Sequence, residues 1–222
     1  MTKKIGLIFI ICLSISIANA QVNDAQLWTK LSVSKTFSQS FQTQIDLSTR
    51  FGNNITDLNT FYLQLSGEYK LAKWLKLGAN FRYAEKYDLE EMTHSRYRGG
   101  IYALLKKKFF KTLELQYRTM YQHQYTDIYT SEKGTIPTYY FRNKLNVSLD
   151  LDQKYSPYVS CEMYHKYTYK FQDLSKLRYA LGVNYEINNL HKIDLYYLIQ
   201  KETNVSNPLS SYVIGLAYKL SL

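Results

Sequence analysis

The stretch Phe41–Phe51, FQTQIDLSTRF, alternates between two kinds of side chain, and this alternation decides the fold. Its odd positions are mostly apolar, as at Ile45 and Leu47, whereas every even position is polar or charged, as at Asp46 and Arg50. A period of two residues predicts a β-strand with one apolar and one polar face. Such a strand suits a soluble sheet, which buries the apolar face, or a membrane barrel, which turns that face toward lipid.

The same alternation recurs along most of the chain and leaves almost nothing for helices. The chain has 23 tyrosines and 10 phenylalanines but only nine glycines and three prolines, a composition that favours strands and membrane interfaces. Beyond the first 20 residues, no segment has the roughly 18 consecutive apolar residues that a membrane-spanning helix needs. The predicted strands cover about residues 25–36, 41–51, 58–71, 74–86, 95–105, 111–125, 139–151, 157–169, 176–187, 192–202 and 210–222.

The positions of the charges indicate which face lies inside. They gather on the polar face, while the opposite face carries almost none over its middle and is rich in tyrosines, whose hydroxyls need partners when buried. In a membrane barrel such tyrosines form girdles at the two interfaces, and Tyr83, Tyr125, Tyr167 and Tyr185 suit that place. We therefore place the apolar face outside. The candidate lumen-lining residues are Arg50, Glu68, Arg82, Arg96, Arg98, Glu114, Arg118, Arg142, Lys144, Glu162 and Arg178.

The connectors alternate between short and long, which is typical of outer-membrane barrels with short periplasmic turns and longer extracellular loops. We expect the connectors 87–94 and 126–138 to be extracellular, and 106–110 and 152–156 to be periplasmic. A soluble up-and-down barrel such as a lipocalin also fits this alternation.

The predicted fold is all-β, a closed antiparallel transmembrane β-barrel of ten to twelve strands. Bacterial single-chain barrels normally have an even number of strands, whereas eleven segments are visible in the sequence. The first two segments could form one long bent strand, which would give ten strands. A short unrecognised strand would instead give twelve.

The first 20 residues have the features of a secretory signal peptide. Two lysines precede a largely apolar stretch that ends at Ile17, and Ala18–Ala20 supplies small residues before a cleavage site. We expect residues 1–20 to be removed and residues 21–222 to form a single barrel domain in the bacterial outer membrane. Cys161 is the only cysteine of that domain, so no intrachain disulfide is possible.

Four features of the chain belong together: an early Trp-containing strand, an Arg closing the next strand, a Pro-Tyr strand start and an Arg-Tyr-x-x-Gly strand. They lie at Trp28, Arg50, Pro157-Tyr158 and Arg178–Gly182. With these features the chain resembles a family of Gram-negative outer-membrane barrels, common in the Bacteroidota, that is known only as a domain of unknown function (DUF2490). The resemblance spans the mature chain and implies a barrel and its location, but no reaction. The chain departs from outer-membrane barrels in general by ending in Leu222 and not in an aromatic residue.

Candidate chemistry is sparse. The histidines, His94, His123, His165 and His191, lack the spacing of a metal site, so we expect no metal, cofactor or catalytic residue. A lipid-modifying enzyme would pair His123 or His165 with a serine on the outer wall. Lysines cluster only in KKKFFK at 106–111, so the formal net charge of +10 does not indicate nucleic-acid binding.

The sequence therefore favours a non-enzymatic structural barrel or a narrow passive pore for small solutes, which anions would enter more readily. We expect a lumen filled by paired charges in preference to a conducting one. The alternatives are an outer-membrane lipid-modifying enzyme and a soluble lipocalin-like binder of an apolar ligand. The expected partners are outer-membrane lipid, lipopolysaccharide and the barrel-assembly machinery, and the sequence does not determine the oligomeric state.

Overall fold

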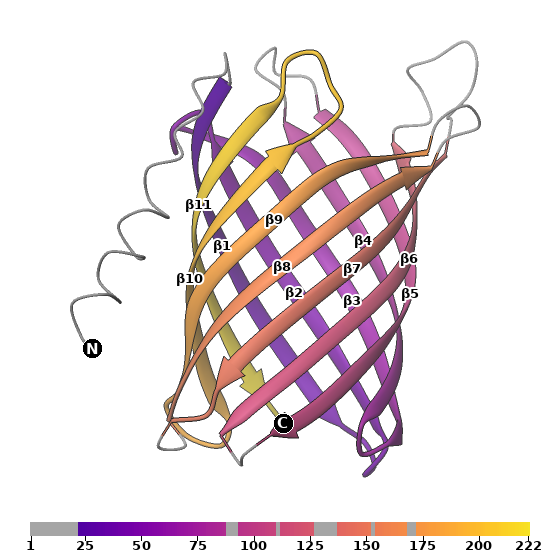
Figure 1. Cartoon of the computed structure of the whole chain (residues 1–222), viewed down its shortest axis with the longest axis vertical. Coiled ribbons are helices and arrows are strands. Elements are labelled where there is room, and N and C mark those ends of the chain that lie inside the picture. Colours follow the sequence, from indigo (N-terminus) through magenta and orange to yellow (C-terminus); the bar gives the residue numbers. More distant parts are fainter. Residues whose placement is uncertain (1–21, 88–92, 110–111, 127–136, 152–153, 168–171) are drawn as a thin grey trace, which may run out of the picture.

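The chain forms a closed β-barrel (Figure 1). The computed structural model describes residues 22–87, 93–109, 112–126, 137–151, 154–167 and 172–222. Within these ranges there are eleven strands, and the predicted segments and the barrel are confirmed. The strands are β1 (Val22–Thr36), β2 (Phe41–Gly52), β3 (Asp57–Ala72), β4 (Leu75–Tyr87), β5 (Thr93–Phe109), β6 (Leu113–Thr126), β7 (Thr138–Leu149), β8 (Tyr155–Tyr167), β9 (Gln172–Glu186), β10 (His191–Glu202) and β11 (Leu209–Ser221). No helix long and apolar enough to cross a membrane occurs in the described ranges.

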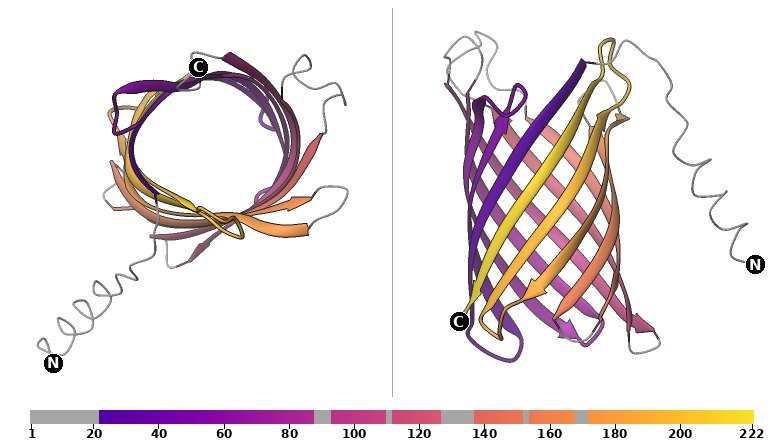
Figure 2. Two further views of the ribbon diagram at one scale, coloured as in Figure 1. Left: turned by 90° about the horizontal axis from the view of Figure 1, so that it is seen from above. Right: turned by 90° about the vertical axis from the view of Figure 1, so that its left-hand side faces the viewer.

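The barrel closes through a parallel pair of strands. Every strand pairs antiparallel with the next along the chain, but β1 and β11 pair in parallel, from Val22 opposite Leu209 to Ser34 opposite Ser221. The pairing therefore differs from the all-antiparallel pattern at this seam, where β1 and β11 lie side by side (Figure 2). An odd number of strands requires one such pair, because the first and last strands then run in the same direction.

The first two segments do not form one bent strand. A tight turn separates β1 from β2, and the backbone N–H groups of Phe37 and Ser38 both donate to the carbonyl oxygen of Phe41, at 3.0 and 3.3 Å. The chain reverses there, so Ser32 on β1 lies opposite Asp46 on β2. The count is consequently eleven, neither the ten nor the twelve that an even number would give.

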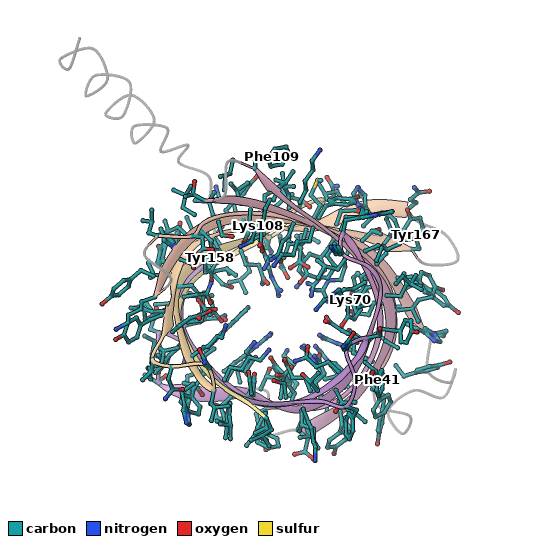
Figure 3. All side chains as sticks on the ribbon, turned by 90° about the horizontal axis from the view of Figure 1, so that it is seen from below. Phe41, Lys70, Lys108, Phe109, Tyr158 and Tyr167 are labelled. Carbon is teal, nitrogen blue, oxygen red and sulfur yellow. The ribbon has the colours of Figure 1, made fainter. Side chains whose placement is uncertain are left out.

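The two faces of the sheet have the polarity that the charges predicted. In β2 the side chain of Ile45 is 51% exposed on the outer wall, whereas the neighbouring Asp46 is only 4% exposed inside the barrel. The same alternation places Leu65 and Leu195 outside, and Ser48 and Gln122 inside. Seen along the barrel axis, side chains project from the ribbon both outward and into the lumen (Figure 3). An apolar outer wall and a polar interior are the reverse of a lipocalin-like binder, which needs an apolar interior.

The connections divide between two rims. The lower rim, at the bottom of Figure 1, joins β1–β2, β3–β4, β5–β6, β7–β8 and β9–β10, and the other connections lie at the upper rim. The strand ends that flank the predicted connectors 87–94 and 126–138 therefore lie at the upper rim, and those that flank 152–156 lie at the lower rim. Of these connectors, residues 88–92, 127–136 and 152–153 lie outside the described residues. The predicted turn 106–110 is wrong in its bounds, because β5 continues through Phe109.

Aromatic side chains line the outer wall near both rims. At the lower rim the rings of Phe37 and Phe41 lie 6.1 Å apart, and those of Tyr155 and Tyr185 lie 4.9 Å apart. At the upper rim Tyr83 is 5.4 Å from a second tyrosine ring, that of Tyr97. The two aromatic bands bracket the apolar middle of the wall, as the girdles of membrane barrels do.

Candidate functional site

Three cavities follow one another along the lumen. We call them the upper chamber, of about 380 Å³, the central chamber, of about 440 Å³, and the lower chamber, of about 530 Å³. The upper and central chambers share Arg82 and Arg178 as lining residues, and the central and lower chambers share Glu68 and Arg118. Neighbouring chambers are therefore contiguous. No described side chain crosses the middle of the barrel when it is viewed from below (Figure 3).

All the lumen-lining candidates border one of these chambers. Arg50, Arg96 and Arg98 line the upper chamber; Arg82 and Arg178 line the upper and central chambers; Arg142 and Glu162 line the central chamber; Glu68, Arg118 and Lys144 line the central and lower chambers; Glu114 lines the lower chamber. The set is spread over the height of the lumen and does not form one compact site.

The charge of the lining changes along the axis. Among the described residues, the lining of the upper chamber has seven basic members, Arg50, Arg82, Lys86, Arg96, Arg98, Lys176 and Arg178, and two acidic ones, Asp24 and Glu202. The lower chamber has five of each: Lys106, Lys108, Arg118, Lys144 and Lys192 against Glu68, Glu114, Asp150, Glu186 and Asp194. The lumen is therefore strongly cationic near the upper rim and balanced near the lower rim.

Glu162 is the main acidic centre of the central chamber. Its Oε1 accepts hydrogen bonds from Arg142 at 2.7 Å and from Arg118 at 3.2 Å, and its Oε2 lies 3.7 Å from Nη1 of Arg178. The hydroxyl of Tyr164 donates to the same Oε2 at 3.0 Å. Glu162 is only 6% exposed, so three arginines from three strands are held around one buried negative charge.

Arginines and aromatic rings alternate around the wall in a band that we call the arginine–aromatic belt. Its members, from β4 across the β1–β11 seam to β7, are Arg82, Tyr62, Arg50, Trp28, Arg178, Tyr164 and Arg142. The distances from guanidinium carbon to ring centroid run from 3.8 Å, for Arg50 over Trp28 and Arg82 over Tyr62, to 5.3 Å. Stacking on a ring fixes a guanidinium plane and leaves its edge N–H groups available to a ligand.

Two arginines of the upper chamber have no carboxylate partner in the part of the chain that the structure describes. Among the described residues, no hydrogen bond or ion pair reaches Arg50 or Arg98, and the Nε of each is buried without an acceptor. Arg98 also lies directly opposite Arg82 in the β4–β5 ladder. Within the described part of the chain, Arg82 donates only to the neutral side-chain oxygen of Gln64, at 3.0 and 2.6 Å. Like charges directly opposite in a sheet repel each other.

Two tyrosines inside the barrel donate hydrogen bonds to carboxylates that line the lumen. Tyr102 of β5 crosses Gly78 of β4 and donates to Oε1 of Glu68 on β3 at 2.9 Å. Tyr158 of β8 crosses a glycine of β9 in the same manner and donates to Asp194 on β10 at 3.0 Å. In both cases a glycine on the intervening strand makes room for the ring.

The lumen also has an aromatic part that was not predicted from the sequence. Trp28, Tyr62 and Tyr164 were not among the predicted lining residues, yet each is no more than 7% exposed inside the barrel and contacts an arginine. Their even numbers, the parity of Asp46 and Arg50, were the signal available in the sequence. Bulky aromatics at polar-face positions indicate rings that line the lumen.

His123 and His165 were the histidines that a lipid-modifying enzyme would use. The ring of His123 stacks on Tyr139 at 4.5 Å, and its Nε2 is buried without a hydrogen-bond partner. The Nδ1 of His165 is likewise buried without a partner. No serine hydroxyl bonds to either ring among the described residues, and these residues contain no cluster of three metal-ligating side chains.

An apolar outer wall, aromatic bands at both rims and a charged, contiguous lumen define a barrel of the transmembrane type. The family model described as "Protein of unknown function (DUF2490)" matches residues 25–210, and the chain belongs to this family. No curated protein matches the sequence.

Crystal and other solved structures of barrels resemble the chain at very low identity. The β domain of the Bordetella autotransporter BrkA is 9% identical at a TM-score of 0.47, covering 80% of this chain and 82% of that one. The KdgM porin in complex with disordered oligogalacturonate is 10% identical at a TM-score of 0.45, covering 79% and 84%. The translocator domain of the autotransporter NalP from Neisseria meningitidis is 13% identical at a TM-score of 0.41, covering 75% and 70%. Likeness at this level carries no argument about what the present barrel does.

Proposed function

We propose that the chain is a non-enzymatic outer-membrane barrel that gives small anionic solutes a passive path through its lumen. The observation that carries this proposal is the contiguous row of chambers, whose lining is strongly cationic at one end and balanced at the other. A narrow aqueous path with low-dielectric walls strengthens the field of its lining charges, so anions are concentrated and cations excluded.

The outer wall supports the membrane location. Its exposed leucines, isoleucines and phenylalanines, such as Leu65, Ile101 and Phe81, would be costly to leave in water but are favourable in lipid. Outer-membrane lipid and lipopolysaccharide are the partners that this wall fits, and insertion would require the barrel-assembly machinery. The upper rim then faces the outside of the cell and the lower rim the periplasm.

Planar bilayers test the path directly. The purified barrel should give discrete conductance steps, and under a KCl gradient the reversal potential should indicate preference for chloride. The double variant Arg50→Gln/Arg98→Gln removes two upper-chamber charges with which no described carboxylate pairs, so anion preference should fall severalfold.

The matched control is Lys106→Gln/Lys192→Gln. It also removes two positive charges, but from the lower chamber, where Lys106 pairs with Glu114 at 2.7 Å and Lys192 pairs with Glu186. The control should reduce anion preference less than the upper-chamber double variant does. A wild-type barrel that inserts but never conducts, or that prefers cations, would refute the proposed path.

The enzymatic alternative has a separate test. Purified barrel is incubated with phospholipid and with lipopolysaccharide, and products are sought by mass spectrometry. We expect no turnover, because the imidazoles of His123 and His165 lack a serine partner among the described residues. Turnover that disappears in His123→Ala or His165→Ala would replace the pore proposal with a lipid-modifying enzyme.

A further inference from the structure

The upper chamber combines three features that simple lining of a pore does not require. Its arginines outnumber its carboxylates, two of those arginines lack any hydrogen-bond acceptor among the described residues, and a third lies directly opposite one of the two. Each feature has a cost: buried N–H groups lose their water, and adjacent guanidinium groups repel. A bound ligand that supplies oxygens and negative charge would relieve both.

We propose that the upper chamber is a binding site for an oxyanion that carries two or more negative charges, as polyphosphates and polycarboxylates do. This site adds a class of ligand to the proposed function, and it rests on that function only for the route by which the ligand enters. The site is centred on Arg82, Arg98 and Arg50, with the rings of Tyr62 and Trp28 behind them.

The geometry favours an oxyanion over a halide. The guanidinium carbons of Arg50 and Arg82 lie 3.8 Å from the ring centroids of Trp28 and Tyr62, so each ring covers one side of its guanidinium group. Arg82 donates through Nε and Nη2 to Gln64, which leaves its Nη1 for a ligand, whereas Arg50 has no acceptor among the described residues. A guanidinium edge presents two parallel N–H groups that match two oxygens of one phosphate or carboxylate. A single spherical ion cannot satisfy several such edges.

The two described carboxylates of the upper chamber already have partners. Glu202, which lines the upper chamber, is paired with Lys176 at 2.9 Å, and Asp24 accepts hydrogen bonds from Gln26 and from the backbone of Asn54. Glu162 lies in the central chamber, where its carboxylate accepts hydrogen bonds from Arg118, Arg142 and Tyr164.

Trp28 provides a reporter inside the site. The chain has two tryptophans, and the other, Trp74, is 57% exposed at the lower rim. In a Trp74→Phe background the fluorescence comes from Trp28 alone, and Arg50 lies on its ring. An anion that draws Arg50 away from the ring should change the emission, so titration measures binding without any ion current.

The experiment titrates folded Trp74→Phe barrel in detergent at low ionic strength with tripolyphosphate, orthophosphate and chloride. Tripolyphosphate should give a saturable change with at least tenfold higher affinity than orthophosphate, and chloride should give none at matched concentration. Adding Arg98→Gln should weaken tripolyphosphate binding at least tenfold, Arg98→Lys should weaken it less, and Lys106→Gln should leave it unchanged.

A structural role for Arg98 makes a different prediction. If Arg98 only stabilises the barrel wall, Arg98→Gln should lower the temperature at which the heat-modifiable gel band shifts. If Arg98 instead serves to bind a ligand, Arg98→Gln removes its repulsion from Arg82, and that temperature should stay unchanged or rise. Should Arg98→Gln fail to fold, Arg82→Gln gives the same test, because it removes the guanidinium opposite Arg98 and keeps the contact of Arg50 with Trp28 that reports binding. Absence of saturable tripolyphosphate binding, or equal weakening by Arg98→Gln and Lys106→Gln, overturns the site.

The two proposals fail separately. If the barrel binds tripolyphosphate but does not conduct ions, the proposed binding site is supported and the proposed pore is refuted. If the barrel conducts ions but binds no tripolyphosphate, the pore is supported and the binding site is refuted.

Discussion

The ring of Tyr102 occupies the space that a side chain at Gly78 would need. A Cβ built on Gly78 would lie 2.3 Å from Cζ and 2.6 Å from the hydroxyl oxygen of Tyr102. All three atoms closest to that position belong to the side chain of Tyr102. The contact therefore couples a backbone position on β4 to the hydrogen bond that Tyr102 makes with Glu68 on β3.

Replacing Gly78 with alanine should displace this ring and break its hydrogen bond with Glu68. We expect a loss of roughly 1–3 kcal/mol in the free energy of unfolding, the usual cost of overpacking. Glu68 keeps Lys76 at 3.0 Å but loses the tyrosine, so anion preference should also fall. Urea unfolding in detergent and reversal potentials measure the two effects.

Gly99→Ala is the matched control for that substitution. Gly99 lies on the neighbouring strand β5, where an added Cβ meets nothing within 4 Å, so its free energy of unfolding should change little. Tyr102→Phe separates the hydroxyl from the ring and should reproduce the change in selectivity without the overpacking. Equal stability of Gly78→Ala and Gly99→Ala would contradict the contact.

Glu162→Gln should make the lumen more cationic and the barrel less stable. The substitution removes the charge that balances Arg142 and Arg118 and leaves these guanidinium groups facing a neutral amide. Loss of one partner of a buried ion pair costs about 3–5 kcal/mol, and the extra positive charge should shift the reversal potential further toward chloride. Glu85→Gln, which removes a carboxylate bound by Tyr83 and Tyr87 near the upper rim, serves as control. A shift of the same size in both variants would refute the role of Glu162.

The outer wall should respond to charge according to depth. Leu65 lies in the middle of β3 and is 55% exposed, whereas Phe41 begins β2 at the lower rim. In a bilayer, Leu65→Arg should cost roughly 2–4 kcal/mol and Phe41→Arg about 0–1 kcal/mol. Unfolding from lipid vesicles measures both. Similar costs at the two positions would argue against a membrane-spanning wall.

The orientation of the barrel can be read by labelling single cysteines in a Cys161→Ser background. Ser206 lies in the β10–β11 connection at the upper rim, and Gln39 lies in the β1–β2 turn at the lower rim. An impermeant maleimide added to intact cells should label Ser206→Cys, and should label Gln39→Cys only after the outer membrane is opened. The opposite pattern would invert the orientation and place the cationic chamber at the periplasmic mouth.

The strands could be predicted from the sequence because their side chains alternate between two faces, so a shift of one residue would exchange the polar and the apolar face. The alternation around Asp46 and Ile45 identifies β2, and the same parity assigns Arg82 and Glu162 to the lumen. These are local properties, since neighbouring side chains on a strand must point to opposite faces.

Closure and contacts across the lumen depend on register between strands that are distant in sequence. The parallel seam pairs Val22 with Leu209, and nothing near either residue specifies that partner. The belt brings Arg50 within 5.3 Å of the ring of Tyr62, a contact set by the stagger of β2 against β3. Gly78 did offer a signal, because glycine inside a strand often marks the close approach of another group.

The odd number of strands has a consequence for engineering the chain. Since β1 and β11 run in the same direction, Val22 starts at the upper rim and Ser221 ends at the lower rim. Joining them in a circular permutant would need a linker that follows β11 for its whole length, thirteen residues or on the order of 40 Å, through lumen or lipid. Peptides fused before Val22 and after Leu222 would instead emerge on opposite sides of a membrane, which makes this barrel a scaffold with one attachment point in each compartment.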